Sequence, residues 1–198
     1  MKDLLKDRER GAEADHFRRE DARLLEKMRA RAQVGEIATA LAAKLRIDDA
    51  ELLRRVADLG LDQETGPAIL LAPLVQVAWA GGSVTEAERK TVLELAASRG
   101  VTPGTATYDK VVEWLERRPP DALFETAMAV MRVGFSVLPE HERIERIKGL
   151  VATCRRVAEA SGGGLARLIG MSDGVSGEES AVLDAITTKL AAHRGPRT

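Results

Sequence analysis

The sequence of 198 residues has one cysteine, Cys154, and few aromatic residues: three Phe, two Trp and one Tyr. A single cysteine excludes an intramolecular disulfide and any zinc site built from several cysteines, and it fits a reducing cytoplasmic location. With so little aromatic area, the core must consist mainly of Leu, Val, Ile and Ala, which favours helix over sheet. No segment alternates polar and apolar residues over the length of a strand. These absences predict an all-α fold.

Neither sign of charge dominates, because 30 Lys and Arg face 31 Asp and Glu, giving a net charge of -1. This balance disfavours general binding to nucleic acid or anionic lipid. Long apolar runs are missing too: the longest, residues 67–75 and 77–80 on either side of Gln76, is shorter than the roughly 18 residues of a membrane span. Charged residues follow Met1 at once, so no secretory signal is expected. The sequence predicts a soluble cytoplasmic protein without a membrane-inserted segment or a nucleic-acid partner.

The first 33 residues are rich in charge, with ten Lys or Arg, eight Asp or Glu, no proline and one glycine. This composition predicts a long polar helix. Its larger apolar residues form only a thin stripe, made of Leu5, Phe17, Leu24, Leu25 and Met28. Such a helix cannot bury itself well alone. It is either a solvated or frayed extension, or an arm that becomes ordered on a partner or on a second copy of the chain.

Two short amphipathic helices are expected next, at residues 35–45 and 48–59. Asp48 is a suitable N-cap for the second helix, because its carboxylate can accept hydrogen bonds from the first free N–H groups. Gly60 is a suitable C-terminal stop. We therefore assign residues 1–60 to a charged helical arm followed by two short helices.

A nearly continuous apolar segment at residues 69–80 predicts the central helix of a core, which Pro73 must kink or restart. Further helices are expected at residues 85–98, 106–116, 120–133, 139–160, 165–169 and 176–192. We assign residues 61–193 to one all-helical domain and expect residues 194–198 to be a disordered tail.

A weak internal repeat relates two junctions between a loop and a helix, at an offset of 91 residues. The aligned pairs are Val84 with Val175, Thr85 with Ser176, Glu88 with Glu179, Val92 with Leu183, and Leu95 with Ile186. In each copy a hydroxyl residue precedes a glutamate by three positions, which is the pattern of a capping box. The repeat predicts two related helical halves, and the boxes themselves imply structure rather than chemistry.

At these junctions the sequence, TrpAlaGlyGlySerValThrGluAlaGluArg at 79–89 and SerAspGlyValSerGlyGluGlu at 172–179, resembles the tellurite-resistance TerB-like family. The resemblance covers about residues 66–192 and implies an all-helical domain of two related halves with an acidic, metal-associated surface. The family's first-loop aspartate is replaced here by Gly81. The second loop keeps Asp173, followed by Glu178 and Glu179. These three are the candidate ligands for Ca²⁺ or another divalent cation, although three carboxylates are fewer than the six to eight oxygens that Ca²⁺ takes.

The first sixty residues resemble a second family, the inhibitory zeta subunits of ATP synthases. The similarity lies in AspArgGluArg at 7–10, MetArgAlaArgAla at 28–32, GlyGlu at 35–36 and AspAspAlaGlu at 48–51. Members of that family insert their N-terminal segment between catalytic subunits of the rotary ATPase. The resemblance therefore implies apolar anchors and charged residues that set the register. The implied partner-binding residues are Asp7, Arg8, Glu9, Arg10, Phe17, Arg18, Arg19, Leu24 and Met28.

Signatures of catalysis are missing from the sequence. His16, His141 and His193 are far apart and form no HExxH pair, and GxSxG, HRD, GxGxxG and P-loop patterns do not occur. The glycines at 162–164 lack the lysine and the preceding strand of a phosphate-binding loop, and Cys154 has the surroundings of a core residue. We expect a protein that is not an enzyme and needs no cofactor.

The leading hypothesis is thus a cytoplasmic regulatory protein whose charged N-terminal helix binds a protein partner, with the catalytic subunits of a rotary ATPase as one candidate. A rival hypothesis is a TerB-like stress-response protein that binds a divalent cation through Asp173, Glu178 and Glu179, with Glu86 and Glu88 as further donors. A third is a homodimer formed through the N-terminal helix.

Overall fold

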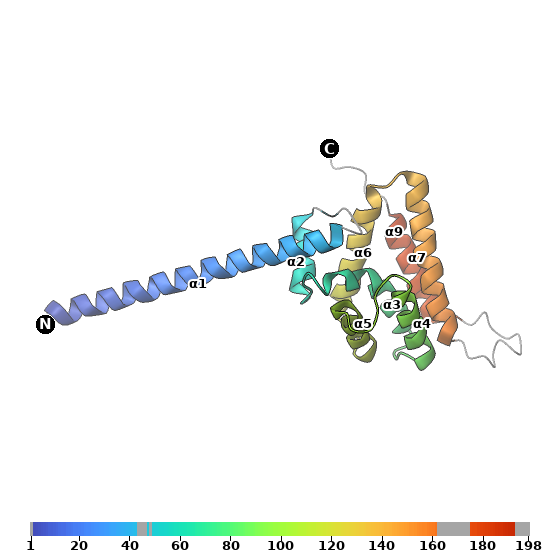
Figure 1. Ribbon diagram of the computed structural model, residues 1–198, viewed down its shortest axis with the longest axis horizontal. Helices are drawn as coiled ribbons and strands as arrows, with labels where there is room; N and C mark the ends of the chain where they lie inside the picture. Colours follow the sequence, from blue (N-terminus) through green and yellow to red (C-terminus); the bar gives the residue numbers. More distant parts are fainter. Residues whose placement is uncertain (1, 43–46, 48, 162–174, 193–198) are drawn as a thin grey trace, which may run out of the picture.

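The computed structural model describes residues 2–42, 47, 49–161 and 175–192, and these contain helices and no strand. The predicted all-α class is confirmed for this part of the chain. In order, the elements are α1 (Lys2–Ala42), α2 (Ala50–Asp58), the 3-10 helix η1 (Gly66–Leu71), α3 (Ala72–Ala78), α4 (Glu86–Ala97), α5 (Ala106–Glu116), α6 (Asp121–Ser136), α7 (Glu140–Ser161) and α9 (Gly177–Ala191). Figure 1 shows a bundle from which most of α1 projects. The helix expected at 165–169 and the tail expected at 194–198 lie outside the described residues.

The long helix α1 corrects one sequence-based boundary. Residues 35–42 continue the same helix, whereas the sequence suggested a separate helix beginning at residue 35. Gly35 costs about 1 kcal/mol relative to alanine inside a helix, but Ile37 and Leu41, two and six residues further on, are fully buried. Their burial offsets that cost, so the helix continues through the glycine.

The second helix, α2, starts one residue later than its predicted cap implies. Asp49, not Asp48, is the N-cap, and its Oδ1 accepts hydrogen bonds from the N–H groups of Glu51 and Leu52, each at 3.0 Å. The two aspartates are adjacent, and the sequence offered no means of choosing between them. The stop at Gly60 is confirmed, because this glycine has φ +76 immediately after the C-cap Leu59.

The core surrounds the short helix α3, which α6, α7 and α9 contact. Six of its seven residues are buried: Ala72, Pro73, Leu74, Val75, Val77 and Ala78. Pro73 lies in the first turn of α3, directly after η1, so the chain restarts a helix there as expected. Ile37 and Leu41 of α1 belong to the same hydrophobic cluster as Leu74. One continuous core therefore includes residues on both sides of position 60.

Both predicted capping boxes are present. The Thr85 hydroxyl accepts from the N–H of Glu88 while the Glu88 carboxylate accepts from the N–H of Thr85 at 2.7 Å. Ser176 and Glu179 repeat this arrangement, with the Ser176 N–H donating to Glu179 at 2.6 Å. The two glutamates are 2% and 3% exposed, and their side chains hydrogen-bond to each other. The helix starts that share a sequence pattern thus contact each other in space.

Candidate partner-binding helix

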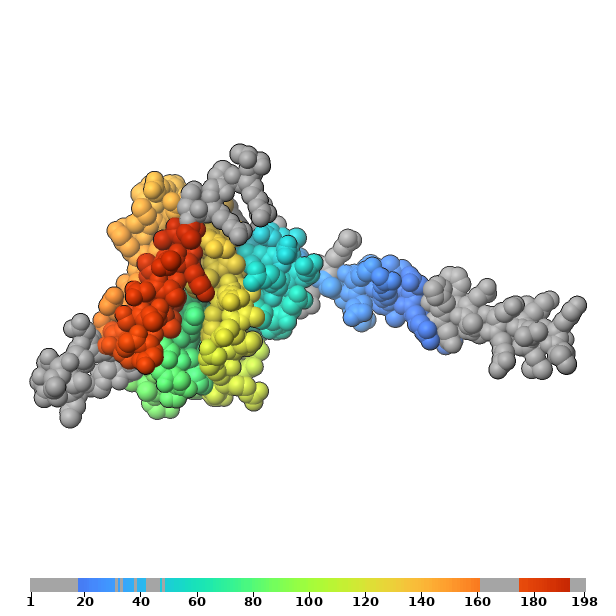
Figure 2. Space-filling model, turned by 180° about the vertical axis from the view of Figure 1, so that it is seen from behind, coloured from blue at the N-terminus to red at the C-terminus, as the bar shows by residue number. Residues whose placement is uncertain are grey.

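The projecting segment, residues 18–30 of α1, is exposed at every position. It includes three large apolar side chains, Leu24, Leu25 and Met28, which are 54%, 53% and 67% exposed. The space-filling view in Figure 2 shows this segment standing clear of the bundle. Leaving such side chains in water forgoes the roughly 1.5–3 kcal/mol that burying each of them can contribute. We call these three residues the apolar stripe.

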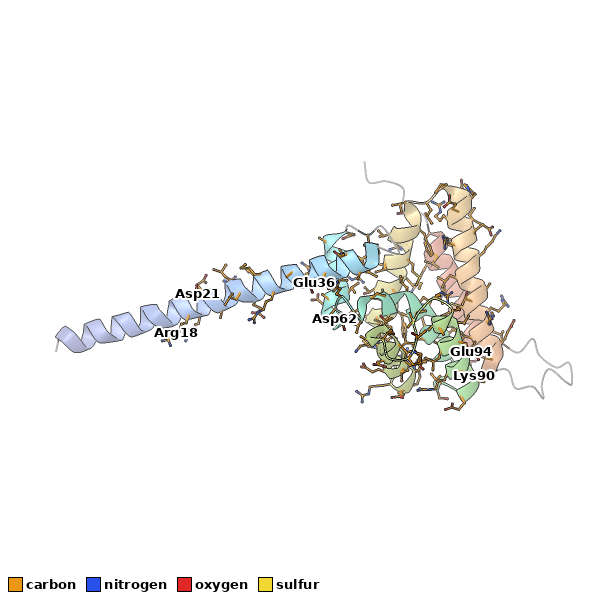
Figure 3. All side chains as sticks on the ribbon, in the orientation of Figure 1. Arg18, Asp21, Glu36, Asp62, Lys90 and Glu94 are labelled. Carbon is orange, nitrogen blue, oxygen red and sulfur yellow. The ribbon has the colours of Figure 1, made fainter. Side chains whose placement is uncertain are left out.

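The C-terminal part of the same helix behaves differently. Ile37 and Leu41 are fully buried and Val34 is partly buried against the core. We call residues 34–42 the root of α1. The helix contacts α2 and η1. Ile37 packs close to η1, because its Cγ2 would lie 3.6 Å from a Cβ added to Gly66. The root is therefore part of the folded bundle, and the projecting segment continues the same helix. Figure 3 labels Arg18 and Asp21 on the projecting segment and Glu36 where the helix reaches the bundle.

Leu25 and Met28 lie on the face of α1 opposite its buried residues, and Leu24 lies at the edge of that face, about 100° from Leu41. Residues of an α-helix are separated by about 100° around its axis. Met28 and Ile37 are nine residues apart, which places them about 180° from each other. Leu25 and Leu41, sixteen residues apart, differ by about 160°. The face of α1 that carries the apolar stripe is thus turned away from the face that packs on the bundle.

The charges around the apolar stripe are mainly positive. Residues 18–30 contain five basic side chains, Arg18, Arg19, Arg23, Lys27 and Arg29, and three acidic ones, Glu20, Asp21 and Glu26. Arg23 lies 3.7 Å from the carboxylate of Glu20, and both side chains are largely exposed. An exposed pair of this kind contributes little to stability. The segment therefore combines an apolar stripe with net positive charge.

The predicted partner-binding residues are only partly described. Arg18, Arg19, Leu24 and Met28 are exposed on the projecting segment. The side chains of Asp7, Arg8, Glu9, Arg10 and Phe17 lie outside those described, although their backbone is part of α1. Leu25 was missing from the predicted set and is as exposed as Leu24. Its position, three residues before Met28, was the signal that could have identified it.

The structure gives the candidate metal ligands different surroundings. Asp173 lies outside the described residues, and Glu178 is exposed. Glu179 is buried, and its carboxylate caps α9 and contacts Glu88. Glu88 has the same role at α4, and its pKa is raised above the ordinary value because burial disfavours its charged form and Glu179 lies beside it. Within the described residues, no three His, Cys, Asp or Glu side chains are grouped as a metal site would need.

Cys154 is a core residue, as expected. It is fully buried on α7, and burial raises the pKa of its thiol to about 12 although Arg99 nearby acts in the opposite direction. The reactive thiolate is therefore nearly absent at neutral pH. His141, 3.9 Å from the Glu142 carboxylate, is exposed on the surface of the same helix.

Comparisons with protein-family models, with curated protein sequences and with solved structures found no match to this chain. The resemblances to the TerB-like and zeta-subunit families therefore stay predictions. Among the helices that the structure describes, none has the length and apolar character needed to cross a membrane.

Proposed function

We propose that this protein is a non-catalytic interaction protein that binds a protein partner through the projecting segment of α1. The observation that carries this proposal is the exposure of Leu24, Leu25 and Met28, with Leu25 and Met28 on the face of the helix opposite the buried Leu41 and Ile37. A helix that docks in a groove commonly presents apolar anchors three or four residues apart. Leu24 and Met28 have the second of these spacings, and Leu25 and Met28 the first.

The partner that fits this segment has an apolar groove with acidic residues along its rim. The five basic side chains of residues 18–30 outnumber the three acidic ones, so an acidic rim would complement them. Complementary charge mainly accelerates association and selects orientation, and its effect weakens as salt increases. Binding should therefore become slower at high ionic strength, while the apolar contacts keep the complex together once it has formed.

A rotary ATPase is the specific partner that the zeta-like N-terminal sequence suggests. In this form of the proposal, the N-terminal part of α1 enters the space between catalytic subunits, with Asp7 to Arg10 leading. The test is ATP hydrolysis by the purified rotary synthase in the presence of the full-length protein. Absence of inhibition at micromolar concentrations would exclude this partner without excluding the binding role of α1.

The binding role itself is tested by site-specific photocrosslinking in cells. A photoreactive amino acid at position 28 should crosslink strongly to one protein, because Met28 lies on the apolar stripe and is 67% exposed. The same group at position 30 serves as the matched control, since residues 28 and 30 are both exposed but about 200° apart around the helix. Equal crosslinking from the two positions would argue against a defined binding face.

Two double variants separate anchoring from general helix properties. Leu24→Gln with Leu25→Gln removes two anchors and leaves position 28 for the photoreactive group, whereas Glu26→Gln with Ala30→Gln changes the opposite face. Only the first should abolish the crosslink or the inhibition. The crosslinked protein could also be a second copy of this chain. In that case the mass of the assembly in solution should halve when residues 1–33 are deleted, and the partner is the chain itself.

A further inference from the structure

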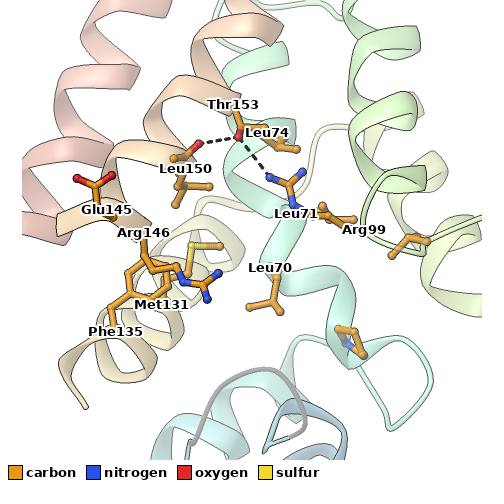
Figure 4. A pocket seen from close by; sticks show the side chains of 13 residues that line it. Leu70, Leu71, Leu74, Arg99, Met131, Phe135, Glu145, Arg146, Leu150 and Thr153 are labelled. Carbon is orange, nitrogen blue, oxygen red and sulfur yellow. Dashed lines mark hydrogen bonds between the residues drawn. The ribbon is translucent and has the colours of Figure 1, made fainter. Parts of the chain in front are cut away.

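A second candidate site lies in the bundle, away from the projecting segment. It is a cleft of about 660 Å³ bounded by η1, α3, α6 and α7 (Figure 4). Clefts that bind small molecules typically measure about 300–1,000 Å³. Its walls are mainly apolar, and the residues that matter most here are Leu70, Leu74, Met131, Phe135 and Leu150. The cleft is thus suited to an apolar body of small-molecule size.

Two arginines lie at this apolar cleft, and neither forms a salt bridge with a carboxylate in the part of the chain that the structure describes. Arg99 donates to the carbonyl oxygen of Leu95 at 3.1 Å and to the hydroxyl of Thr153 at 3.3 Å. These bonds hold its guanidinium beside the cleft, as Figure 4 shows. Arg99 therefore brings a positive charge that no carboxylate of the described chain neutralises.

The second arginine, Arg146, comes from α7. In Figure 4 its guanidinium lies over the cleft, near Met131 and Phe135. The adjacent acid, Glu145, forms its ion pair with Lys148 at 3.2 Å instead. Arg99 and Arg146 come from different parts of the fold and thus both line this mainly apolar cleft.

We propose that this cleft binds a small amphipathic carboxylate, such as a medium-chain fatty acid. Its hydrocarbon chain would contact the apolar walls, and its carboxylate would accept hydrogen bonds from Arg99 and Arg146. Arginine suits this role because its planar group of donors matches a carboxylate, and charge-assisted bonds of this type are about twice as strong as neutral ones. The site does not depend on the function proposed for α1, because none of its lining residues belongs to that helix.

Gly149 provides a way to close the cleft without damaging the fold. It lies in α7 at the cleft wall, and a Cβ added there meets no atom within 4 Å. Leucine is a better helix former than glycine, so Gly149→Leu should fold while its side chain occupies the cleft. Gly149→Ala adds only one methyl group and serves as the graded comparison.

Isothermal titration calorimetry of the full-length protein with decanoate, kept below its micelle concentration, tests the proposal. We expect binding to the parent protein, at least tenfold weaker binding to Gly149→Leu, and a smaller loss for Gly149→Ala. Arg146→Gln should weaken binding at least fivefold. The control Arg155→Gln, an exposed arginine on the same helix that does not line the cleft, should bind decanoate like the parent.

Neutral decanol distinguishes charge recognition from simple apolar binding, and it should bind at least tenfold more weakly than decanoate. Four outcomes would overturn the proposal: no heat with millimolar decanoate, unchanged affinity in Gly149→Leu, equal losses in Arg146→Gln and Arg155→Gln, or equal affinities for decanol and decanoate. Thermal melts of each variant show whether a loss reflects the site or unfolding.

Discussion

Leu41 and Leu24 lie on the same helix, but only the replacement of Leu41 by alanine should reduce stability strongly. Leu41 is fully buried in the core, whereas Leu24 is 54% exposed on the projecting segment. Removing a fully buried leucine side chain costs about 2–5 kcal/mol, because the transfer energy is lost and a cavity remains. A substitution at an exposed position away from such packing usually changes the free energy of unfolding by no more than about 0.5 kcal/mol. We therefore expect Leu41→Ala to cost about 3 kcal/mol and Leu24→Ala almost nothing.

Urea denaturation followed by circular dichroism measures both variants under the same conditions. For a loss of about 3 kcal/mol and an m value of about 2–3 kcal/mol per molar urea, the midpoint of Leu41→Ala should fall by roughly 1–1.5 M. The midpoint of Leu24→Ala should stay within about 0.3 M of the parent. Truncation provides an independent comparison: a chain that starts at residue 31 should keep the parent's stability, and one that starts at residue 43 should lose the contribution of Ile37 and Leu41.

A cost for Leu24→Ala close to that of Leu41→Ala would refute the reasoning. It would mean that the apolar stripe is buried in solution, either on its own bundle or on another copy. Repeating the denaturation over a hundredfold range of protein concentration separates these cases, since only a contact between copies makes the midpoint depend on concentration. In the first case α1 would have no free face to offer a partner.

Three further predictions follow from single residues of the bundle. Gly149→Ala should raise the free energy of unfolding by about 0.5–1 kcal/mol in urea titrations, because alanine is the better helix former and its methyl group meets open space; a lower midpoint would contradict this. Because the pKa of Glu88 is raised above its ordinary value of 4.5, the stability from this group is complete below pH 4.5 and declines as pH rises through the raised pKa. Glu88→Gln, which cannot ionise, should reduce that decline in unfolding titrations from pH 4.5 to 7, and an unchanged slope would exclude Glu88 as its source. The Cys154 thiol, whose pKa is raised to about 12 by burial, should react with a thiol reagent only as fast as the protein unfolds, and rapid reaction in native buffer would show that α7 opens.

Local sequence signals predicted most of the helices. Both capping boxes are specified within four residues, so Thr85 and Ser176 could be placed at helix starts from spacing alone. The length of α1 was missed because its apolar residues change faces, from the stripe around Met28 to the root around Ile37. Apolar residues that lie on one face around Met28 and on another around Ile37 are the pattern expected of two separate helices. The structure shows that a single helix contains both groups and packs on α2 and η1.

The apolar cleft could not be predicted in this way. Arg99 follows α4 and Arg146 lies in α7, so 47 positions separate the two arginines. Each is unremarkable in its own segment, where arginine on a polar helix surface normally faces solvent. Their relation to Leu70 and Phe135 arises only when η1, α6 and α7 pack together. Residue spacing along the chain therefore cannot predict which residues of these distant segments line the same cleft.

The contact between Glu88 and Glu179 gives the repeated capping box a second role. A hydrogen bond between two carboxyl groups requires a proton on one of them, and the raised pKa of Glu88 favours keeping it there. Both side chains lie at the N-termini of α4 and α9, where free N–H groups and the helix dipoles favour an acidic residue. Each glutamate therefore fixes the start of its own helix and contacts the start of the other.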